Sequence, residues 1–139
     1  MISPELENLA ERALLKREAP SPREIEKLIV SGVQRLQDAA NRSISMRGRF
    51  DLASNAAHAL ALAALWRAGY RSESRYLVFQ SLEHTIALPS TSWRVLARAH
   101  RLRNDMEYEA VGEPDERLTE DIIAVAHTVL AALRSASEA

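Results

Sequence analysis

Apolar residues recur at helical spacing along almost the whole chain, and no segment sustains the alternation expected of a strand. Valine, isoleucine and aromatic residues are scattered, whereas the strong helix formers alanine, leucine, arginine and glutamate predominate. The length, 139 residues, is that of one domain. The sequence therefore predicts an all-α fold: a single domain over residues 1–139, built as an up-and-down bundle of five to six antiparallel helices.

Capping residues and breakers predict where the helices begin and end. Ser3 opens a first helix that should stop before the proline-rich break at 19–22, and Ser21 with Glu24 forms a capping box for the second. Residues 45–49, which include Gly48, are expected to connect the second helix to the third. The remaining helices are expected over about 50–68, 72–87, 93–110 and 118–134. The third helix is apolar nearly all round, so we expect it at the centre of the bundle.

Cellular location is constrained by two absences in the sequence. Cysteine is absent, which removes disulfides, thiolate metal sites and cysteine nucleophiles. The longest apolar run, residues 59–66, is too short to span a bilayer, and the acidic, amphipathic first residues do not resemble a signal peptide. We therefore expect a cytoplasmic protein that does not associate with a membrane.

The formal net charge of −1 conceals a strong segregation of charge along the chain. Residues 35–103 contain eleven arginines against four acidic residues, whereas residues 104–139 contain nine acidic residues against two arginines. Two interpretations follow. The arginines pair with the acidic C-terminal segment inside the fold, or they form a basic surface that meets phosphate, for which the planar guanidinium is well suited.

The usual motifs for cofactors and metals are missing. The four glycines stand apart, so there is no phosphate-binding loop, and the four histidines fall on separate predicted helices without metal-ligand spacing. The paired carboxylates at 115–116 and 120–121 lie at the start of the last helix, where the helix dipole accounts for them. We expect no cofactor and no metal.

The fifth predicted helix carries an unusual mixture of side chains on one side. At about 100° per residue, an apolar side meets the core, and a polar side gathers an imidazole, a guanidinium, an amide, a carboxylate and a phenol. The apolar side consists of Val95, Ala99, Leu102 and Met106, the polar side of His100, Arg103, Asn104, Glu107 and Tyr108, and the neighbouring arginines are Arg94, Arg98 and Arg101. Local pairs, Arg103 with Glu107 and Arg101 with Asp105, are the simpler explanation of the polar side.

Residues 103–108 read Arg-Asn-x-x-Glu-Tyr, which resembles the motif of HEPN domains, small helical bundles common in prokaryotes. That motif is an arginine, then Asn, Asp or His, with a histidine further on; here Tyr108 stands in the place of the histidine. The segments 54–58, 69–70 and 76–82 are also similar to HEPN sequences, and the resemblance covers roughly residues 45–110.

The resemblance implies a homodimeric, RNA-directed protein. Many HEPN domains are metal-independent endoribonucleases of toxin–antitoxin or other defence systems, and others accept AMP on a tyrosine from a partner nucleotidyltransferase. By this resemblance Arg103, Asn104 and Tyr108 are the catalytic candidates, with Arg103 on phosphate oxygens and Asn104 positioning. A phenol with a pKa of about 10 accepts a proton poorly at neutral pH, so phosphate binding carries over further than cleavage.

Two classes of function remain open from the sequence. In the first, a HEPN-like protein engages RNA or nucleotide phosphates, with His100, Arg98, Arg101 and Glu107 as further nucleic-acid-binding residues, and acts as an active or degenerate ribonuclease. In the second, a non-enzymatic interaction module uses the same side of the fifth helix, which also includes Trp93, to bind a second copy, an antitoxin or a nucleotidyltransferase. A purely structural bundle is the third reading.

Overall fold

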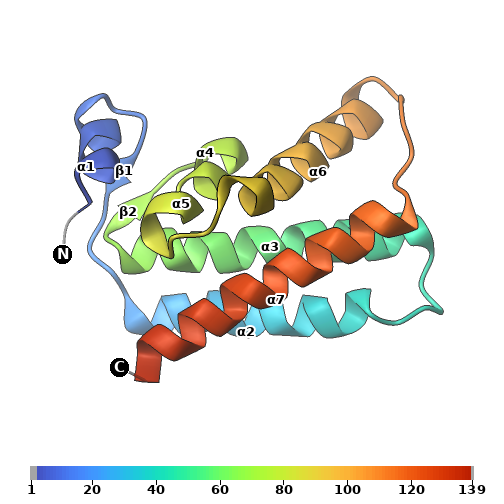
Figure 1. The fold of residues 1–139 in the computed structure, drawn as a ribbon, viewed down its shortest axis with the longest axis horizontal. Helices are drawn as coiled ribbons and strands as arrows, with labels where there is room; N and C mark the ends of the chain where they lie inside the picture. The colour runs from blue at the N-terminus through green and yellow to red at the C-terminus, as the bar shows by residue number, and fades with distance from the viewer. Residues whose placement is uncertain (1–2, 139) are drawn as a thin grey trace.

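The chain is almost wholly helical in the computed structural model, which describes residues 3–138 and the side chains as far as residue 135 (Figure 1). In chain order the elements are α1 (Pro4–Glu11), β1 (Lys16–Arg17), α2 (Pro22–Ala39), α3 (Met46–Arg67), β2 (Tyr70–Arg71), α4 (Arg75–Gln80), α5 (Leu82–Thr85), α6 (Ser90–Tyr108) and α7 (Glu116–Glu138). The expectation of an all-α protein is confirmed. None of the described helices is long and apolar enough to cross a membrane.

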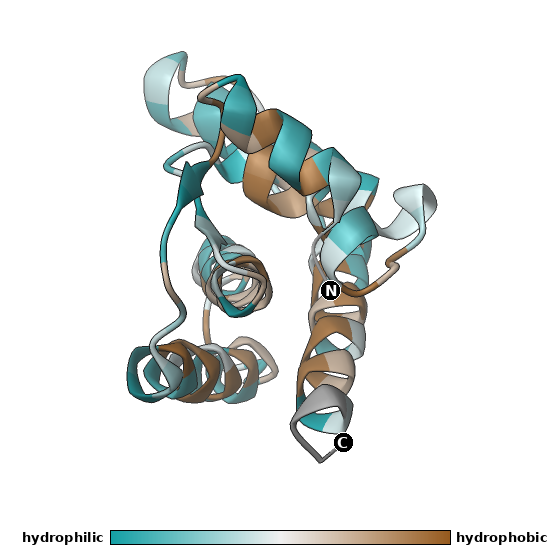
Figure 2. Cartoon of the chain, turned by 90° about the vertical axis from the view of Figure 1, so that its left-hand side faces the viewer, coloured by the Kyte–Doolittle hydropathy of each residue, from teal (hydrophilic) through white to brown (hydrophobic). Residues whose placement is uncertain are grey.

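Helix α3 is the centre of the fold, as its all-round apolar character predicts. It packs against α2, α4, α6 and α7, and it buries residues on most of its circumference, including Phe50, Ala57 and Leu60. The helices around it are amphipathic. In α2 the buried residues recur every three or four positions, and brown and teal stretches accordingly alternate along its ribbon when the molecule is viewed nearly along α3 (Figure 2). The core therefore forms where the apolar sides of the outer helices meet α3.

The directions of the helices differ in part from the expected up-and-down bundle. Helices α2 and α3 form an antiparallel pair, and α6 and α7 run in opposite directions (Figure 1). Helices α3 and α7, however, pack on each other and run the same way, because the chain returns along α6 before α7 begins. Helix α6 also leans away from α3 and α7 toward its C-terminal end (Figure 1).

Serine caps fix the starts of α1, α2 and α3. The Ser3 and Ser21 hydroxyls accept hydrogen bonds from the backbone N–H groups of Leu6 (3.4 Å) and Glu24 (3.3 Å), as predicted. Ser45 does the same for Gly48 (3.1 Å), so α3 begins at Met46. The prediction that residues 45–49 form a connector is wrong, because the cap outweighs the low helix propensity of one glycine.

The N-terminal segment departs most from the sequence prediction. Helix α1 ends at Glu11, Ala13 takes a left-handed conformation (φ 59°), and β1 then pairs antiparallel with β2, with Lys16 opposite Arg71. The expectation of helix throughout is wrong here, since this two-residue ladder depends on a contact between segments distant in sequence. The predicted fourth helix is likewise divided into α4 and α5, which meet at Ser81 and end at Thr85.

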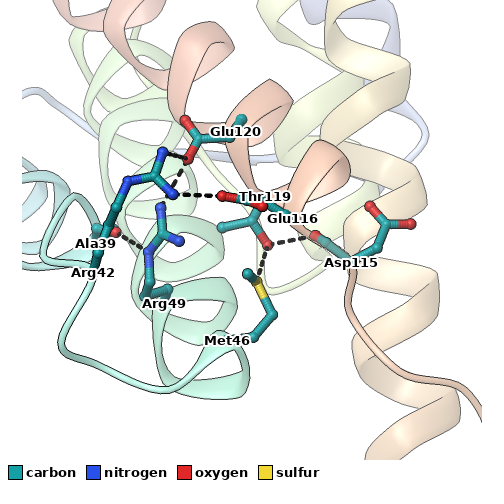
Figure 3. A network of polar contacts seen from close by, with 8 residues as sticks. All are labelled: Ala39, Arg42, Met46, Arg49, Asp115, Glu116, Thr119 and Glu120. Atoms are coloured by element: carbon teal, nitrogen blue, oxygen red, sulfur yellow. Dashed lines mark hydrogen bonds and ion pairs between the residues drawn. The ribbon is translucent and has the colours of Figure 1, made fainter.

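A polar network joins the C-terminal end of α2 and the first turns of α3 to the start of α7 (Figure 3). Arg49, only 3% exposed, donates from Nε to the carbonyl oxygen of Ala39 (2.8 Å) and from Nη2 to Glu120 (2.8 Å). Arg42 pairs with Glu116 (2.5 Å) and more distantly with Glu120 (3.6 Å). At this end of the molecule, arginines of the basic middle region are neutralised by the acidic C-terminal segment.

Candidate anion-binding site

The arginines of α6 are not neutralised in this way. Among the described residues, none of Arg94, Arg98, Arg101 and Arg103 lies within ion-pair distance of a carboxylate. The local pairs expected from the sequence, Arg103 with Glu107 and Arg101 with Asp105, are therefore not formed. Arg94 instead lies over the ring of Trp93, with 5.6 Å between its guanidinium carbon and the ring centroid.

Helix α6 has two buried sides, of which the sequence predicts one. Ala99 and Met106 are buried, and Val95 and Leu102 pack against the core, as expected. Trp93 and Leu96 are buried on a second side of the helix. At about 100° per residue, His100 and Arg103 also lie on this second side of the helix. Both side chains are half-buried, at the margin of the core.

The remaining predicted site residues of α6 lie elsewhere. Asn104 is exposed but stays close to His100, with 3.4 Å between its amide nitrogen and Nε2 of the imidazole. Glu107 is exposed, and Tyr108, at the end of the helix, is 83% exposed. Arg98 and Arg101 are exposed on the opposite side of α6, about 140° and 160° around the helix axis from Arg103. Within one chain, only His100, Arg103 and Asn104 come together.

Helices α3 and α4 add further polar side chains beside Arg103. Nη2 of Arg75, at the start of α4, donates to Oδ1 of Asn55 on α3 (3.1 Å). His58, one turn further along α3, packs edge-on against the ring of Phe79 on α4, with 6.0 Å between ring centroids. A narrow pocket, without room for a water molecule, joins the three helices. Its lining residues include Ser54, Arg75, Phe79, Leu96, His100 and Arg103.

The positive charges of the arginines in this cluster are not balanced by a nearby carboxylate among the described residues, and the pKa values of its side chains reflect this. Burial lowers the pKa of His58 to about 4, and the positive charges of Arg75, His100 and Arg103 act in the same direction. Burial, with Arg75 and Arg103, also lowers the pKa of His100. The pKa of Arg75 is lowered as well, by burial and then by Arg103 and Arg35. Both imidazoles are therefore neutral at pH 7, and no carboxylate contributes to any of these shifts.

Three buried hydrogen-bonding atoms in the pocket have no partner among the described residues: Nε of Arg103, Nδ1 of His100 and Oγ of Ser54. Nε of an arginine is always a donor. When the Asn104 amide donates to Nε2 of His100, the ring proton is on Nδ1, which is then a donor too. A serine hydroxyl can donate as well. The residues that line the pocket thus provide unpaired donors, one of them in the guanidinium group of Arg103, an arrangement that an oxyanion can satisfy, because its oxygens only accept.

The polar side of α6 predicted from the sequence includes Arg103, His100 and Asn104 but not the residues that surround them. His58, Asn55 and Arg75 belong to other helices, and their proximity to Arg103 depends on how α3, α4 and α6 pack. A signal for two of them exists in the sequence: Asn55 and His58 are polar residues, three positions apart, in the alanine-rich middle of α3.

Comparison with models of known protein families gives no match, and no curated protein matches the sequence. Within residues 3–138, no group of three or more His, Cys, Asp or Glu side chains is placed to hold a metal ion.

Proposed function

We propose that this chain is a HEPN-like protein that engages RNA or nucleotide phosphates, with Arg103 as the principal phosphate contact. The observation that carries the proposal is Nε of Arg103, buried beside a second arginine, Arg75; among residues 3–138, Nε has no hydrogen-bond partner and no carboxylate lies within ion-pair distance of either arginine. Phosphate oxygens provide both the negative charge and the acceptors that such a site lacks. Asn104, through its contact with His100, is in place to position the neighbouring imidazole.

The exposed arginines of α6 support the same proposal at longer range. Arg94, Arg98 and Arg101 have no ion-pair partner among the described residues, so their charge remains available to attract a polyanion. Because Arg98 and Arg101 lie on the opposite side of α6 from Arg103, they add to the positive potential around the helix rather than contact the same phosphate. This role for Arg98 and Arg101 is the one assigned to them from the sequence.

In this proposal cleavage requires a second copy of the chain. Tyr108 is 83% exposed at the free end of α6, so it is not directed to the cluster of its own chain. The HEPN resemblance implies a homodimer in which two motif helices face each other, and Tyr108 would then act across the interface. Without such a dimer, the site binds phosphate, but the Tyr108 side chain does not reach it to assist cleavage.

RNA binding by Arg103→Gln is the direct test. We expect this variant to bind a short single-stranded RNA at least about tenfold more weakly than the wild type at low salt, because one charge-assisted contact is lost. Any cleavage of the same RNA should fall in parallel. Arg12→Gln removes an equally positive side chain that is exposed and far from α6 in sequence, and it should remain within about twofold of the wild type. The proposal is wrong if the folded wild type retains no RNA, or if both variants bind equally.

The exposure of Tyr108 favours a second candidate, a non-enzymatic partner that accepts AMP from a nucleotidyltransferase or binds an antitoxin. A phenol that is 83% exposed at the end of a helix is accessible to another enzyme. Incubation with ATP and a nucleotidyltransferase, where the genomic neighbourhood supplies one, should then add one AMP to the wild type and none to Tyr108→Phe, as measured by intact-protein mass spectrometry. Equal modification of both proteins would exclude Tyr108 as the acceptor.

A further inference from the structure

We infer that the cluster between α3, α4 and α6 binds a terminal phosphate, the phosphomonoester dianion of a nucleotide or of an RNA end, in preference to an internal phosphodiester. The inference rests on the proposed function for its ligand class, and it goes beyond it by assigning a role to Arg75, His58 and Ser54, which lie outside the α6 motif. Four features of the cluster lead to it: its charge, its donors, its ionisable imidazoles and its access.

The charge of the cluster matches a dianion. Arg75 and Arg103 are permanently positive, each lies close enough to affect the electrostatics of the other, and neither pairs with a carboxylate among the described residues. An internal phosphodiester carries one negative charge and would neutralise only one of them. A phosphomonoester carries roughly −1.5 to −2 at pH 7, close to the charge of the two arginines.

The donors of the cluster also match a terminal phosphate. Three atoms, Nε of Arg103, Nδ1 of His100 and Oγ of Ser54, are buried without a hydrogen-bond partner among the described residues. Ser54 as a whole is only 4% exposed. A phosphomonoester presents three terminal oxygens, one for each of these donors, whereas an internal phosphodiester has two non-bridging oxygens. The ester oxygen of the terminal phosphate remains free to point outward, to the nucleoside.

The imidazoles can adapt to an incoming negative charge. His58 and His100 are neutral at pH 7, since burial and the surrounding arginines lower the pKa of each. A bound dianion adds negative charge beside both imidazoles and so raises the pKa of each. The titratable groups that act on His58 come from α4 and α6: Arg75 from α4, and His100 and Arg103 from α6.

Access to the cluster is through side chains that are only half-buried. The pocket itself is too narrow for a water molecule, so a phosphate must displace a side chain to reach the inner donors. Arg75 and Arg103 are long and only half-buried, so in the proposed binding mode their side chains change rotamer to admit the phosphate while the helices stay in place. The nucleoside would then remain outside, over the half-exposed edges of Arg75 and His58.

The test compares two RNAs of identical sequence, one with a 5′-phosphate and one with a 5′-hydroxyl, and adds AMP as the small probe. We expect the 5′-phosphorylated RNA to bind at least about tenfold tighter, and AMP to compete with it. Arg75→Gln should reduce the preference to within about twofold, while Arg23→Gln, an exposed arginine of α2, should leave it unchanged.

A second measurement needs no substitution and therefore does not depend on the folding of a variant. Addition of AMP should shift the imidazole NMR signals of His58 and His100 and raise their pKa values, and the signals of the exposed His127 should stay unchanged.

The outcomes separate this inference from the proposed function. Equal binding of the two RNAs would overturn the inference and leave RNA binding by Arg103 intact, and so would AMP binding with no response from either imidazole. Absence of binding to either RNA would overturn both. A phosphoserine peptide that binds as tightly as AMP would overturn the assignment to nucleotides and point to a phosphoprotein partner.

Discussion

Arg49 is a charged side chain that the fold buries deeply, and it should contribute more to stability than the exposed ion pairs around it. Its guanidinium holds the Ala39 carbonyl at the end of α2 and Glu120 on α7 (Figure 3). Arg49→Met keeps most of the apolar volume but removes both contacts. We expect a loss on the order of 2–4 kcal/mol in the free energy of unfolding, measured with urea.

The control for Arg49 is Arg42, which pairs with the same end of α7. Its side chain is 70% exposed, so Arg42→Met should cost less than about 1 kcal/mol. Similar losses in the two variants would show that burial does not strengthen the Arg49 contacts.

His58 should make the stability of the protein depend on pH. Its pKa is about 4 in the folded protein, below the value of about 6.5 expected when unfolded, so the unfolded state binds more protons between these values. The contribution of His58 to the free energy of unfolding is therefore fully present above about pH 6.5 and is lost as the pH drops toward 4, by on the order of 2 kcal/mol. His58→Gln should flatten that part of the pH profile, measured as urea midpoints.

His127→Gln is the matched control for His58, because His127 is exposed on α7. Its pH profile should coincide with that of the wild type over the same range. A wild-type profile that is flat between pH 4 and 6.5 would contradict the prediction for His58.

At the residue level, the sequence is sufficient to select Arg103 and its neighbour Asn104, because both belong to one short motif. It is not sufficient to select Arg75 or His58, whose role depends on the packing of three helices. Nor does it show how deeply each arginine of α6 is buried. Only the packed fold distinguishes the half-buried arginine from the exposed ones.

Among the elements, the contact between α2 and α3 depends on the absence of a side chain at Gly32. A Cβ atom at this position would lie 2.7 Å from Cγ of Leu60, which is fully buried. Glycine to alanine in the middle of an exposed helix normally adds about 1 kcal/mol of stability. Here we expect Gly32→Ala to destabilise the protein by about 1–3 kcal/mol, because α2 and α3 must separate or Leu60 must shift. A thermal unfolding midpoint equal to or above that of the wild type would contradict this.

Helix positions follow from local chemistry more closely than helix ends do. The caps at Ser3 and Ser21 and the apolar stripes locate α1, α2, α3, α6 and α7, since caps and periodicity are local properties. The pairing of β1 with β2 and the division of α4 from α5 are not local: the first needs two segments to meet, and the second occurs where the chain bends over α3.

For the molecule as a whole, the segregation of charge along the sequence becomes a segregation in space. The acidic start of α7 neutralises Arg42 and Arg49, whereas the arginines of α6 stay unpaired among the described residues. The first interpretation of the sequence, pairing with the acidic segment, therefore holds for Arg42 and Arg49 but not for the arginines of α6. A net charge of −1 is compatible with a local basic surface.

This separation predicts different responses of binding and stability to salt. RNA affinity should fall steeply between about 50 and 200 mM salt, because binding releases counter-ions from the phosphates. The slope of log affinity against log salt should decrease by roughly one unit in Arg103→Gln. The thermal unfolding midpoint should change little over the same range, because most of the ion pairs are exposed. An affinity that does not vary with salt would contradict a phosphate-based interaction.

The lean of α6 away from the core has a consequence for how the site can be observed. Beyond Arg103 this helix buries only Met106 among its described residues, and residues 109–115 then lead to α7 without forming a helix (Figure 1). Few buried contacts therefore oppose transient opening of its last turns, and their amide hydrogens should exchange with deuterium well before those of α3. Occupancy of the site can be followed as slower exchange in the segment around residues 100–108, without a label or a substitution.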